Sequence, residues 1–192
     1  MSNISRTPTM KNAPLLPLLA LATLLAGCQV TDTPTQEPQT PEETASAEAA
    51  FDAIKSLEGT WEGTLVFSDG REMPTSNEFK VVSGGNTVVE TLIEGDVEMA
   101  TTYTMEGGTL LAKHYCVLGT EPTFEVSLTE DGTIELTPTA NTPYTVGEDD
   151  FVTGMTFDIS DAAAQTISRT GVISEGGEDV TNEAVLTKTT GA

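Results

Sequence analysis

Alternation between apolar and polar residues is the feature of this sequence that most constrains its fold. From Thr60 onward, runs of roughly five to ten residues repeat with a period of two, and turn residues such as Asp69-Gly70 and Gly107-Gly108 separate them. Successive side chains of a strand point to opposite faces, so each run predicts a strand with one buried face. About nine or ten such runs follow one another, which predicts an all-β protein.

The turns between these runs indicate how the strands are arranged. Most turns are short enough for hairpins, so neighbours in sequence are expected to pair antiparallel in a meander. A flat meander leaves two unpaired edge strands, whereas closure into a barrel removes both. We therefore expect an antiparallel up-and-down β-barrel of about 8–10 strands, with a two-sheet sandwich as the alternative. The sequence shows no repeat of about 20–50 residues, which disfavours a propeller or a solenoid.

The amino-terminal residues lack this alternation and resemble a secretory signal. Arg6 and Lys11 precede an apolar run over residues 13–26. As a helix, such a run is about 21 Å long, too short to span a hydrocarbon core of about 30 Å. A basic segment followed by a short apolar segment predicts a signal peptide over residues 1–27.

The residues Leu25-Ala26-Gly27-Cys28 follow this apolar run directly and resemble the lipobox of bacterial lipoproteins. The resemblance implies that Cys28 receives a diacylglycerol, that residues 1–27 are removed, and that the new amino terminus is acylated. Several acyl chains hold a protein at a membrane effectively permanently. The next residue is Gln29 and not aspartate, which by analogy implies the outer membrane, facing the periplasm or the cell surface. The alternative is an ordinary cysteine beyond a simple secretory signal.

A tether and a helix are expected between this anchor and the strands. Residues 28–40 hold few apolar groups, which predicts a disordered spacer. Thr40 can then cap a helix, since Pro41 fits the first helical position and Glu43 completes a capping box. The domain is therefore expected to cover residues 41–192, with one short helix before the barrel.

The predicted helix carries one apolar stripe, and Gly59 can end it. The stripe consists of Ala47, Ala50, Phe51, Ile54 and Leu57. A frayed continuation of the tether is the alternative, although the three larger side chains indicate that at least the second half of the helix docks.

The residues Gly59-Thr60-Trp61 resemble the G-x-W signature of the lipocalins and the wider calycin barrels. In those folds a short helix closes one barrel end, and the tryptophan packs there beneath a basic side chain from a late strand. The resemblance implies this position for Trp61 and suggests Arg169 as its cation–π partner. Residues 99–124 are also similar to a segment of uncharacterised bacterial calycin-like proteins, for which no function can be carried over.

His114 and Cys116 lie two residues apart on one predicted strand, so they share a face that is expected to line the barrel. One hypothesis is a reactive or ligand-binding pair. It would be either a thiol whose reactivity is modified by the imidazole or two soft ligands for a metal or haem. The other is ordinary core packing. With Tyr103, these two residues are the candidate ligand-binding residues. A metal would need carboxylates such as Glu90 or Glu125, and the spacing favours neither, so we predict no metal and no cofactor.

Charge and motifs exclude several functions. The chain has 192 residues, with 30 acidic and 8 basic side chains and a formal net charge of −22. This charge repels phosphate backbones, so no nucleic acid is expected as a partner. The sequence has no P-loop, G-x-S-x-G or H-E-x-x-H motif. The acidic clusters at 148–150 and 178–179 lack EF-hand spacing and are interpreted as solvated turns. We therefore predict no catalytic residues.

Two hypotheses for the function are retained, with an enzyme ranked third. The first is a lipid-anchored binding module whose barrel takes a small, largely apolar ligand. The second is a structural or interaction protein of the cell envelope with a packed, ligand-free barrel. An interior cavity of about 300 Å³ or more, lined mainly by apolar groups, would favour binding. Six Phe, three Tyr and one Trp leave few bulky groups to fill the interior, which favours a cavity.

Overall fold

The structure is a computed structural model that describes residues 39–189. The predicted signal peptide, the lipidation at Cys28 and all but the end of the predicted tether lie outside the described residues. Within the described part, no helix is long and apolar enough to cross a membrane.

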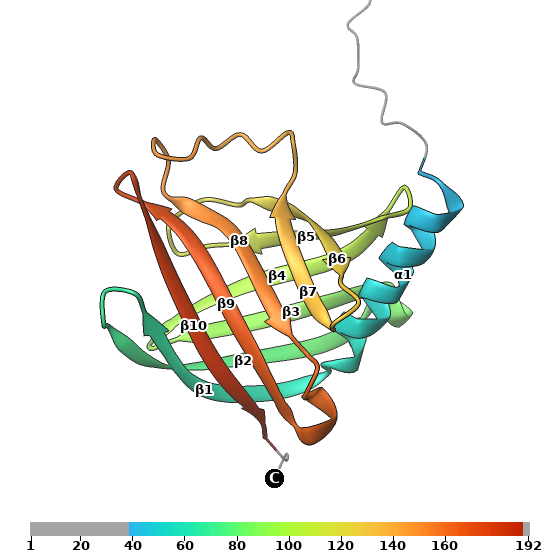
Figure 1. The fold of residues 1–192 in the computed structure, drawn as a ribbon, viewed down its shortest axis with the longest axis horizontal. Helices are drawn as coiled ribbons and strands as arrows, with labels where there is room; N and C mark the ends of the chain where they lie inside the picture. Colours follow the sequence, from blue (N-terminus) through green and yellow to red (C-terminus); the bar gives the residue numbers. More distant parts are fainter. Residues whose placement is uncertain (1–38, 190–192) are drawn as a thin grey trace, which may run out of the picture. The chain divides into compact units, whose positions relative to one another are not determined.

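One α-helix and ten strands make up the described residues (Figure 1). The helix α1 spans Pro41–Ser56. The strands are β1 (Gly59–Phe67), β2 (Glu72–Val82), β3 (Thr87–Glu94), β4 (Val97–Glu106), β5 (Thr109–Tyr115), β6 (Thr123–Leu128), β7 (Thr133–Pro138), β8 (Phe151–Asp158), β9 (Thr166–Glu175) and β10 (Glu178–Lys188). Short 3₁₀ helices, η1 (Ser83–Gly85) and η2 (Ala162–Ala164), lie in the β2–β3 and β8–β9 connections.

The sheet closes on itself through its first strand. β1 pairs antiparallel with β2 on one side and with β10 on the other, and the remaining strands pair antiparallel with their neighbours in sequence. The predicted all-β, antiparallel up-and-down barrel is confirmed with ten strands, and the sandwich alternative is excluded. Closure pairs both edges of the meander, as the sequence argument required.

The helix begins and packs as its sequence predicts. Glu43 donates its backbone N–H to the Thr40 hydroxyl at 3.3 Å, and the Glu43 carboxylate accepts the Thr40 N–H at 2.8 Å, which completes the capping box. The helix ends at Ser56, before Gly59, which has a φ of 120° and begins β1. The predicted apolar stripe is buried along its whole length: Ala47, Ala50, Phe51, Ile54 and Leu57.

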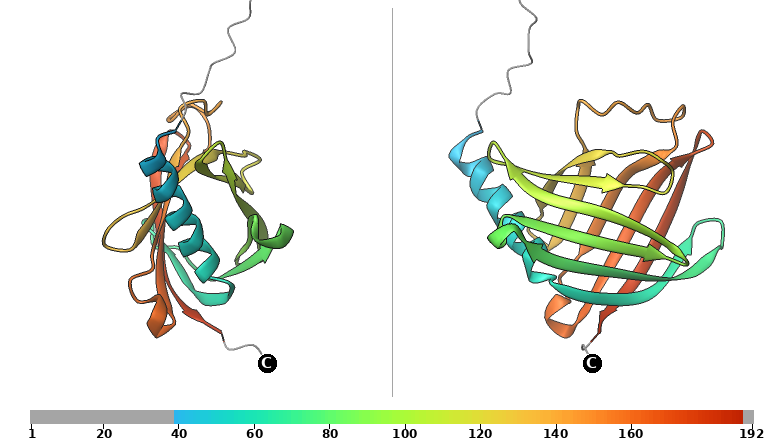
Figure 2. Two further views of the ribbon diagram at one scale, coloured as in Figure 1. Left: turned by 90° about the vertical axis from the view of Figure 1, so that its right-hand side faces the viewer. Right: turned by 180° about the vertical axis from the view of Figure 1, so that it is seen from behind.

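The helix closes one end of the barrel. It packs mainly against β4, β5 and β6, and Figure 2 shows it lying across that end. Because the strands alternate in direction, the β2–β3, β4–β5, β6–β7 and β8–β9 connections lie at this helix end. The other five connections, beginning with the β1–β2 turn, lie at the opposite end, which we call the mouth.

Trp61 anchors the helix end, but its basic partner differs from the one expected. The indole Nε1 donates a hydrogen bond of 2.7 Å to the Leu57 carbonyl, and the side chain is 1% exposed. Lys188 Nζ lies 5.1 Å from the ring centroid, so the structure places Lys188, and not Arg169, over Trp61. The physical reason is closure: β10 pairs with β1 in a register that sets Lys188 opposite Trp61.

The predicted strand that carries His114 and Cys116 ends earlier in the structure. β5 stops at Tyr115, and the chain turns at Gly119, whose φ is 78° and whose N–H donates to the Cys116 carbonyl at 3.1 Å. Cys116 therefore lies just beyond the strand, in the β5–β6 connection at the mouth.

Packing of the helix stripe generates a stability prediction. We expect Ile54→Ala to lower the free energy of unfolding by about 2–5 kcal/mol, because Ile54 is completely buried and the barrel end cannot collapse around the cavity left behind. Urea unfolding followed by circular dichroism measures the change. Val185→Ala is the control, since Val185 is 64% exposed and should change stability by less than about 0.5 kcal/mol. Equal effects of the two substitutions would contradict docking of α1.

Candidate functional site

A cavity of about 210 Å³ lies in the mouth half of the barrel. Most of its wall is apolar and comes from β1, β2, β3, β4 and β8: Phe67, Met73, Leu92, Met99, Val152 and Met155. Its polar wall comprises Arg71, Glu94, His114, Arg169, Glu175 and Asn182, and the β5–β6 connection adds Cys116, Val117 and Leu118. The apolar character matches the expected binding cavity, whereas the volume falls below the expected 300 Å³.

Two of the three candidate ligand-binding residues line this cavity. His114 and Cys116 form part of its wall, and His114 is 1% exposed. Tyr103 is also completely buried, but it is not among the residues that line the cavity. Its hydroxyl donates a hydrogen bond of 2.6 Å to the Glu90 carboxylate, so the structure places Tyr103 in the core behind the cavity wall.

Buried polar residues form a row across three neighbouring strands. Glu90 of β3 lies opposite Thr101 of β4, and Thr101 lies opposite His114 of β5. Thr101 Oγ1 and His114 Nδ1 are 3.0 Å apart, within hydrogen-bond distance. The Asn77 side-chain amide donates to the Glu90 carboxylate from the adjacent strand β2. The row therefore links the cavity wall at His114 to a hydrogen-bonded network in the core.

Burial shifts the pKa values of the titratable side chains in and beside this row. It lowers the pKa of His114 to about 4, with a smaller contribution from the positive charge of Arg169, so the imidazole is neutral at pH 7. Burial also raises the pKa of Glu90, against the hydrogen bonds from Tyr103 and Asn77. The pKa of Tyr103 is raised well above its ordinary value by burial and by the neighbouring Glu90. Tyr103 therefore stays protonated and can donate to Glu90.

Cys116 does not have the environment of a reactive thiol. Burial raises the pKa of its thiol, and the neighbouring Glu94 raises it further. An activated cysteine needs the opposite shift, because the thiolate is the nucleophile. A neutral His114 supplies no positive charge that could lower it. Cys116 therefore contributes a protonated, half-buried thiol to the cavity wall.

Arg169 supplies a buried positive charge to the cavity. It is 3% exposed, and its guanidinium donates a hydrogen bond of 2.6 Å to the Glu94 carboxylate across the barrel. The Arg169 Nε atom is buried and has no hydrogen-bond partner among the described residues. A buried donor without a partner is costly, so this guanidinium has unused capacity to bind an acceptor.

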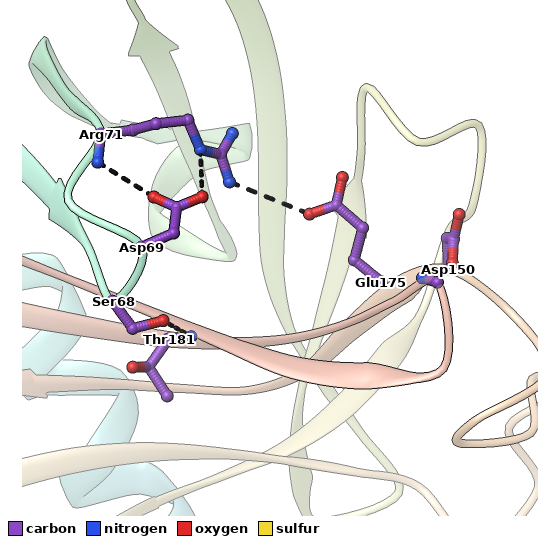
Figure 3. Close-up of polar contacts among 7 residues, drawn as sticks. Ser68, Asp69, Arg71, Asp150, Glu175 and Thr181 are labelled. Carbon is purple, nitrogen blue, oxygen red and sulfur yellow. Dashed lines mark hydrogen bonds and ion pairs between the residues drawn. The ribbon is translucent and has the colours of Figure 1, made fainter.

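Polar contacts connect three segments around the mouth, as Figure 3 shows. Asp69 accepts hydrogen bonds from the Arg71 backbone at 2.9 Å and from Arg71 Nε at 2.6 Å. The Arg71 guanidinium also lies 4.0 Å from Glu175 at the end of β9. The Gly176 N–H donates to the Asp150 carboxylate at 2.8 Å, which joins the β9–β10 turn to the β7–β8 connection. Arg71 and Glu175 therefore face each other at the entrance to the cavity.

The described residues, 39–189, do not bring together a set of ligands for the metal considered as an alternative at His114 and Cys116. No group of three or more His, Cys, Asp or Glu side chains is placed there to hold a metal ion. Glu90 is occupied by Asn77 and Tyr103, and Glu125 is exposed on the outside of β6. Asp149 and Asp150 of the acidic loop each accept a backbone N–H, which is the behaviour of turn residues.

Sequence reasoning missed the ion pair that marks this cavity. Glu94 directly precedes Gly95-Asp96, a pattern typical of a turn, and the G-x-W resemblance suggests Trp61 as the partner of Arg169. The signal that was available is periodicity: Arg169 lies between Ile167 and Gly171 on the inward face of β9, where an arginine is unexpected. Its distance along the chain from Glu94 hides the pair until the barrel closes.

Comparisons with known proteins support the fold alone. No protein-family model matches the sequence, and no curated protein matches it significantly. A crystal structure of a protein of unknown function from the DUF3598 family of Nostoc punctiforme PCC 73102 is similar, with a TM-score of 0.52 and 16% identity. That similarity covers 71% of this chain and 49% of the other, so it spans about half the length of that protein.

Two further structures are less similar. A redesigned β-barrel has a TM-score of 0.36 and 16% identity, over 72% of this chain and 96% of the other. A protein bound to DFHBI has a TM-score of 0.38 and 12% identity, over 73% of this chain and 99% of the other.

The lowered pKa of His114 predicts acid destabilisation. The unfolded chain takes up a proton near pH 6.5, whereas the folded chain does so only near pH 4, so this contribution to stability is lost as the pH falls between these values. We expect wild-type protein to lose about 2–3 kcal/mol more than His114→Gln between pH 7 and pH 4, as measured by urea unfolding.

The variant comparison isolates His114 from other titrating groups. The raised pKa of Glu90 acts in the opposite direction, since its contribution falls as the pH rises, and it is present in both proteins. An imidazole NMR titration with a midpoint near 6.5 would contradict the buried, neutral state of His114.

Proposed function

We propose that this protein is a non-catalytic binding module of the bacterial cell envelope, whose barrel holds a small, largely apolar ligand in the mouth cavity. The observation that carries the proposal is the cavity itself: mostly apolar walls into which only a few polar groups project, with Arg169 and His114 both buried. Small-molecule sites generally combine such walls with a few polar groups that orient the ligand.

The shape of the barrel supports a ligand at this end. The helix end is filled by α1 and by large side chains such as Trp61 and Phe124, whereas the cavity lies at the opposite end among the loops. Barrel mouths are favoured ligand sites because the sheet holds their walls rigid. The volume of about 210 Å³ restricts the ligand to a small one.

The second candidate is an envelope protein with a ligand-free barrel. The specific observation in its favour is the cavity volume, which is below that of common ligand sites. Against it, the buried guanidinium of Arg169 has a donor without a hydrogen-bond partner among the described residues, which costs stability in a barrel whose role is purely structural.

Location at the membrane forms the other half of the proposal. The lipobox resemblance at Leu25-Ala26-Gly27-Cys28, directly after a signal-like apolar run, supports acylation of Cys28. The G-x-W signature at Trp61 further supports a calycin-like module carried on this anchor. The acyl chains would hold the barrel at the membrane surface, most naturally at the outer membrane given Gln29.

Native mass spectrometry of the membrane-extracted protein from its own host tests ligand binding. We expect wild-type protein to carry a small-molecule mass, and Val152→Phe to lose it, because Val152 is buried in the cavity wall and phenylalanine would fill the space. Val185→Phe is the matched control, since Val185 is exposed on the outside of β10, and it should keep the mass. A bare mass for all three proteins would support the ligand-free alternative.

Cell fractionation tests the anchor. We expect Cys28→Ser to move the protein out of the membrane fraction, because the serine cannot receive a thioether-linked diacylglycerol. The wild-type protein should yield an amino-terminal peptide that begins at an acylated Cys28. Retention of Cys28→Ser in the membrane fraction would contradict lipidation, with Cys116→Ser as the control that must leave fractionation unchanged.

A further inference from the structure

The polar groups of the mouth cavity form a donor and an acceptor in the same space. We propose that this cavity recognises a neutral carboxamide group on a small apolar body, with Arg169 donating to the amide oxygen and His114 Nε2 accepting an amide N–H. The inference rests on the proposed function and specifies the ligand class for the same cavity.

The donor is the Arg169 guanidinium. It lines the cavity, and its one hydrogen bond to a described residue uses Nη2, which binds Glu94. Guanidinium carries five N–H groups and accepts nothing, so most of its donors still need an acceptor. Nε also lacks a partner among the described residues, but it is fully buried, so the donors offered to the cavity are the other N–H groups of the guanidinium. A carbonyl oxygen in the cavity would supply the missing acceptor.

The acceptor is His114, in the tautomer that carries its proton on Nδ1. Thr101 Oγ1 and His114 Nδ1 are 3.0 Å apart, and which of the two donates depends on the imidazole tautomer. We assign the proton to Nδ1, which then donates to Thr101 Oγ1. A neutral imidazole with its proton on Nδ1 has a lone pair on Nε2. Nε2 has no partner among the described residues, and His114 belongs to the cavity wall.

The surrounding charge favours a neutral ligand over a carboxylate. The charge of Arg169 is already balanced by Glu94 at 2.6 Å. Glu175 stands at the entrance of the cavity. A carboxylate ligand would bring another negative charge into this space and would also lack the N–H that His114 can accept. An amide satisfies both groups without burying a charge.

The rest of the wall suits a flat apolar body. Met73, Met99 and Met155 lie around the cavity together with Phe67. Methionine side chains adapt to irregular shapes and make favourable sulfur contacts with aromatic rings. A small aromatic amide therefore matches both the apolar wall and the polar pair, and benzamide is the simplest compound of this class.

Four compounds of nearly equal size separate the contributions of the carbonyl oxygen, the amide N–H and a negative charge to binding. Benzamide carries an acceptor and a donor, acetophenone carries the acceptor alone, α-methylstyrene carries neither, and benzoate carries an anion. We would titrate each at pH 7 by calorimetry into the full-length protein in lipid nanodiscs. The same titrations of Val152→Phe, whose cavity is filled by the larger side chain, measure how much of each compound partitions into the lipid. This signal is subtracted from that of the wild-type protein.

Affinity is expected to fall in steps along the series. Loss of the N–H should weaken acetophenone about 2- to 10-fold relative to benzamide, the usual value of a neutral hydrogen bond. Loss of the carbonyl should weaken α-methylstyrene about tenfold or more beyond that, since the donor is charged. Benzoate should bind less tightly than acetophenone.

Two variants assign these steps to the two side chains. His114→Phe should abolish the advantage of benzamide over acetophenone while leaving acetophenone binding within about twofold. The double variant Arg169→Met with Glu94→Gln removes both charges together and should abolish the advantage of acetophenone over α-methylstyrene. The wild-type series is decisive even where a variant fails to fold, because it needs no substitution in the polar pair.

The outcomes distinguish this inference from the proposed function. Equal binding of α-methylstyrene and benzamide would overturn the amide inference while leaving a binding cavity. Tighter binding of benzoate than of benzamide would overturn it in favour of an anion site. Failure of all four compounds to bind would count against both proposals.

Discussion

Pairing of the first strand with the last is the constraint on which the rest of this structure depends. β1 pairs with β10 through seven residue pairs, from Trp61 with Lys188 to Phe67 with Asn182. This pairing removes both edges of the meander and converts one face of every strand into an enclosed interior. It also fixes which residues meet at the two ends: Lys188 covers Trp61 at the helix end, and Asn182 reaches the cavity at the mouth.

The enclosed interior divides into two parts with different physical character. At the helix end, α1 and aromatic side chains exclude water and give the barrel a packed core. At the mouth, the interior keeps a cavity and an ion pair between Arg169 and Glu94. The row from Glu90 to His114 lies between the two environments and satisfies most of its own hydrogen bonds. Buried polar groups are tolerated where they are paired, and Arg169 Nε, like Thr75 Oγ1 and Asn77 Oδ1, is buried without a hydrogen-bond partner among the described residues.

The polar interior also explains where prediction from sequence stopped. β2 begins at Glu72, but apolar alternation becomes visible only at Phe79, because the earlier inward positions include Thr75 and Asn77. A period-two pattern detects a strand only when its buried face is apolar. Similarly, the inward Glu90 of β3 carries no sign in the sequence that Asn77 and Tyr103 would satisfy it. His114 could be placed on the interior because it alternates with Leu110 and Ala112 along its strand, whereas Cys116 reaches the cavity wall from the connection beyond the end of β5.

The sequence by itself determined the local features: the capped helix with its apolar stripe, the turns, and an all-β body of antiparallel strands. These depend on neighbours within a few residues, where propensity and periodicity act directly. Tertiary structure alone decided which distant side chains meet, including Lys188 over Trp61 and Arg169 with Glu94. The physical reason is that the register of closure selects these pairs across long separations in the chain, and no local pattern encodes that register. The cavity is a consequence of the same closure, because its wall is assembled from strands that are remote in sequence.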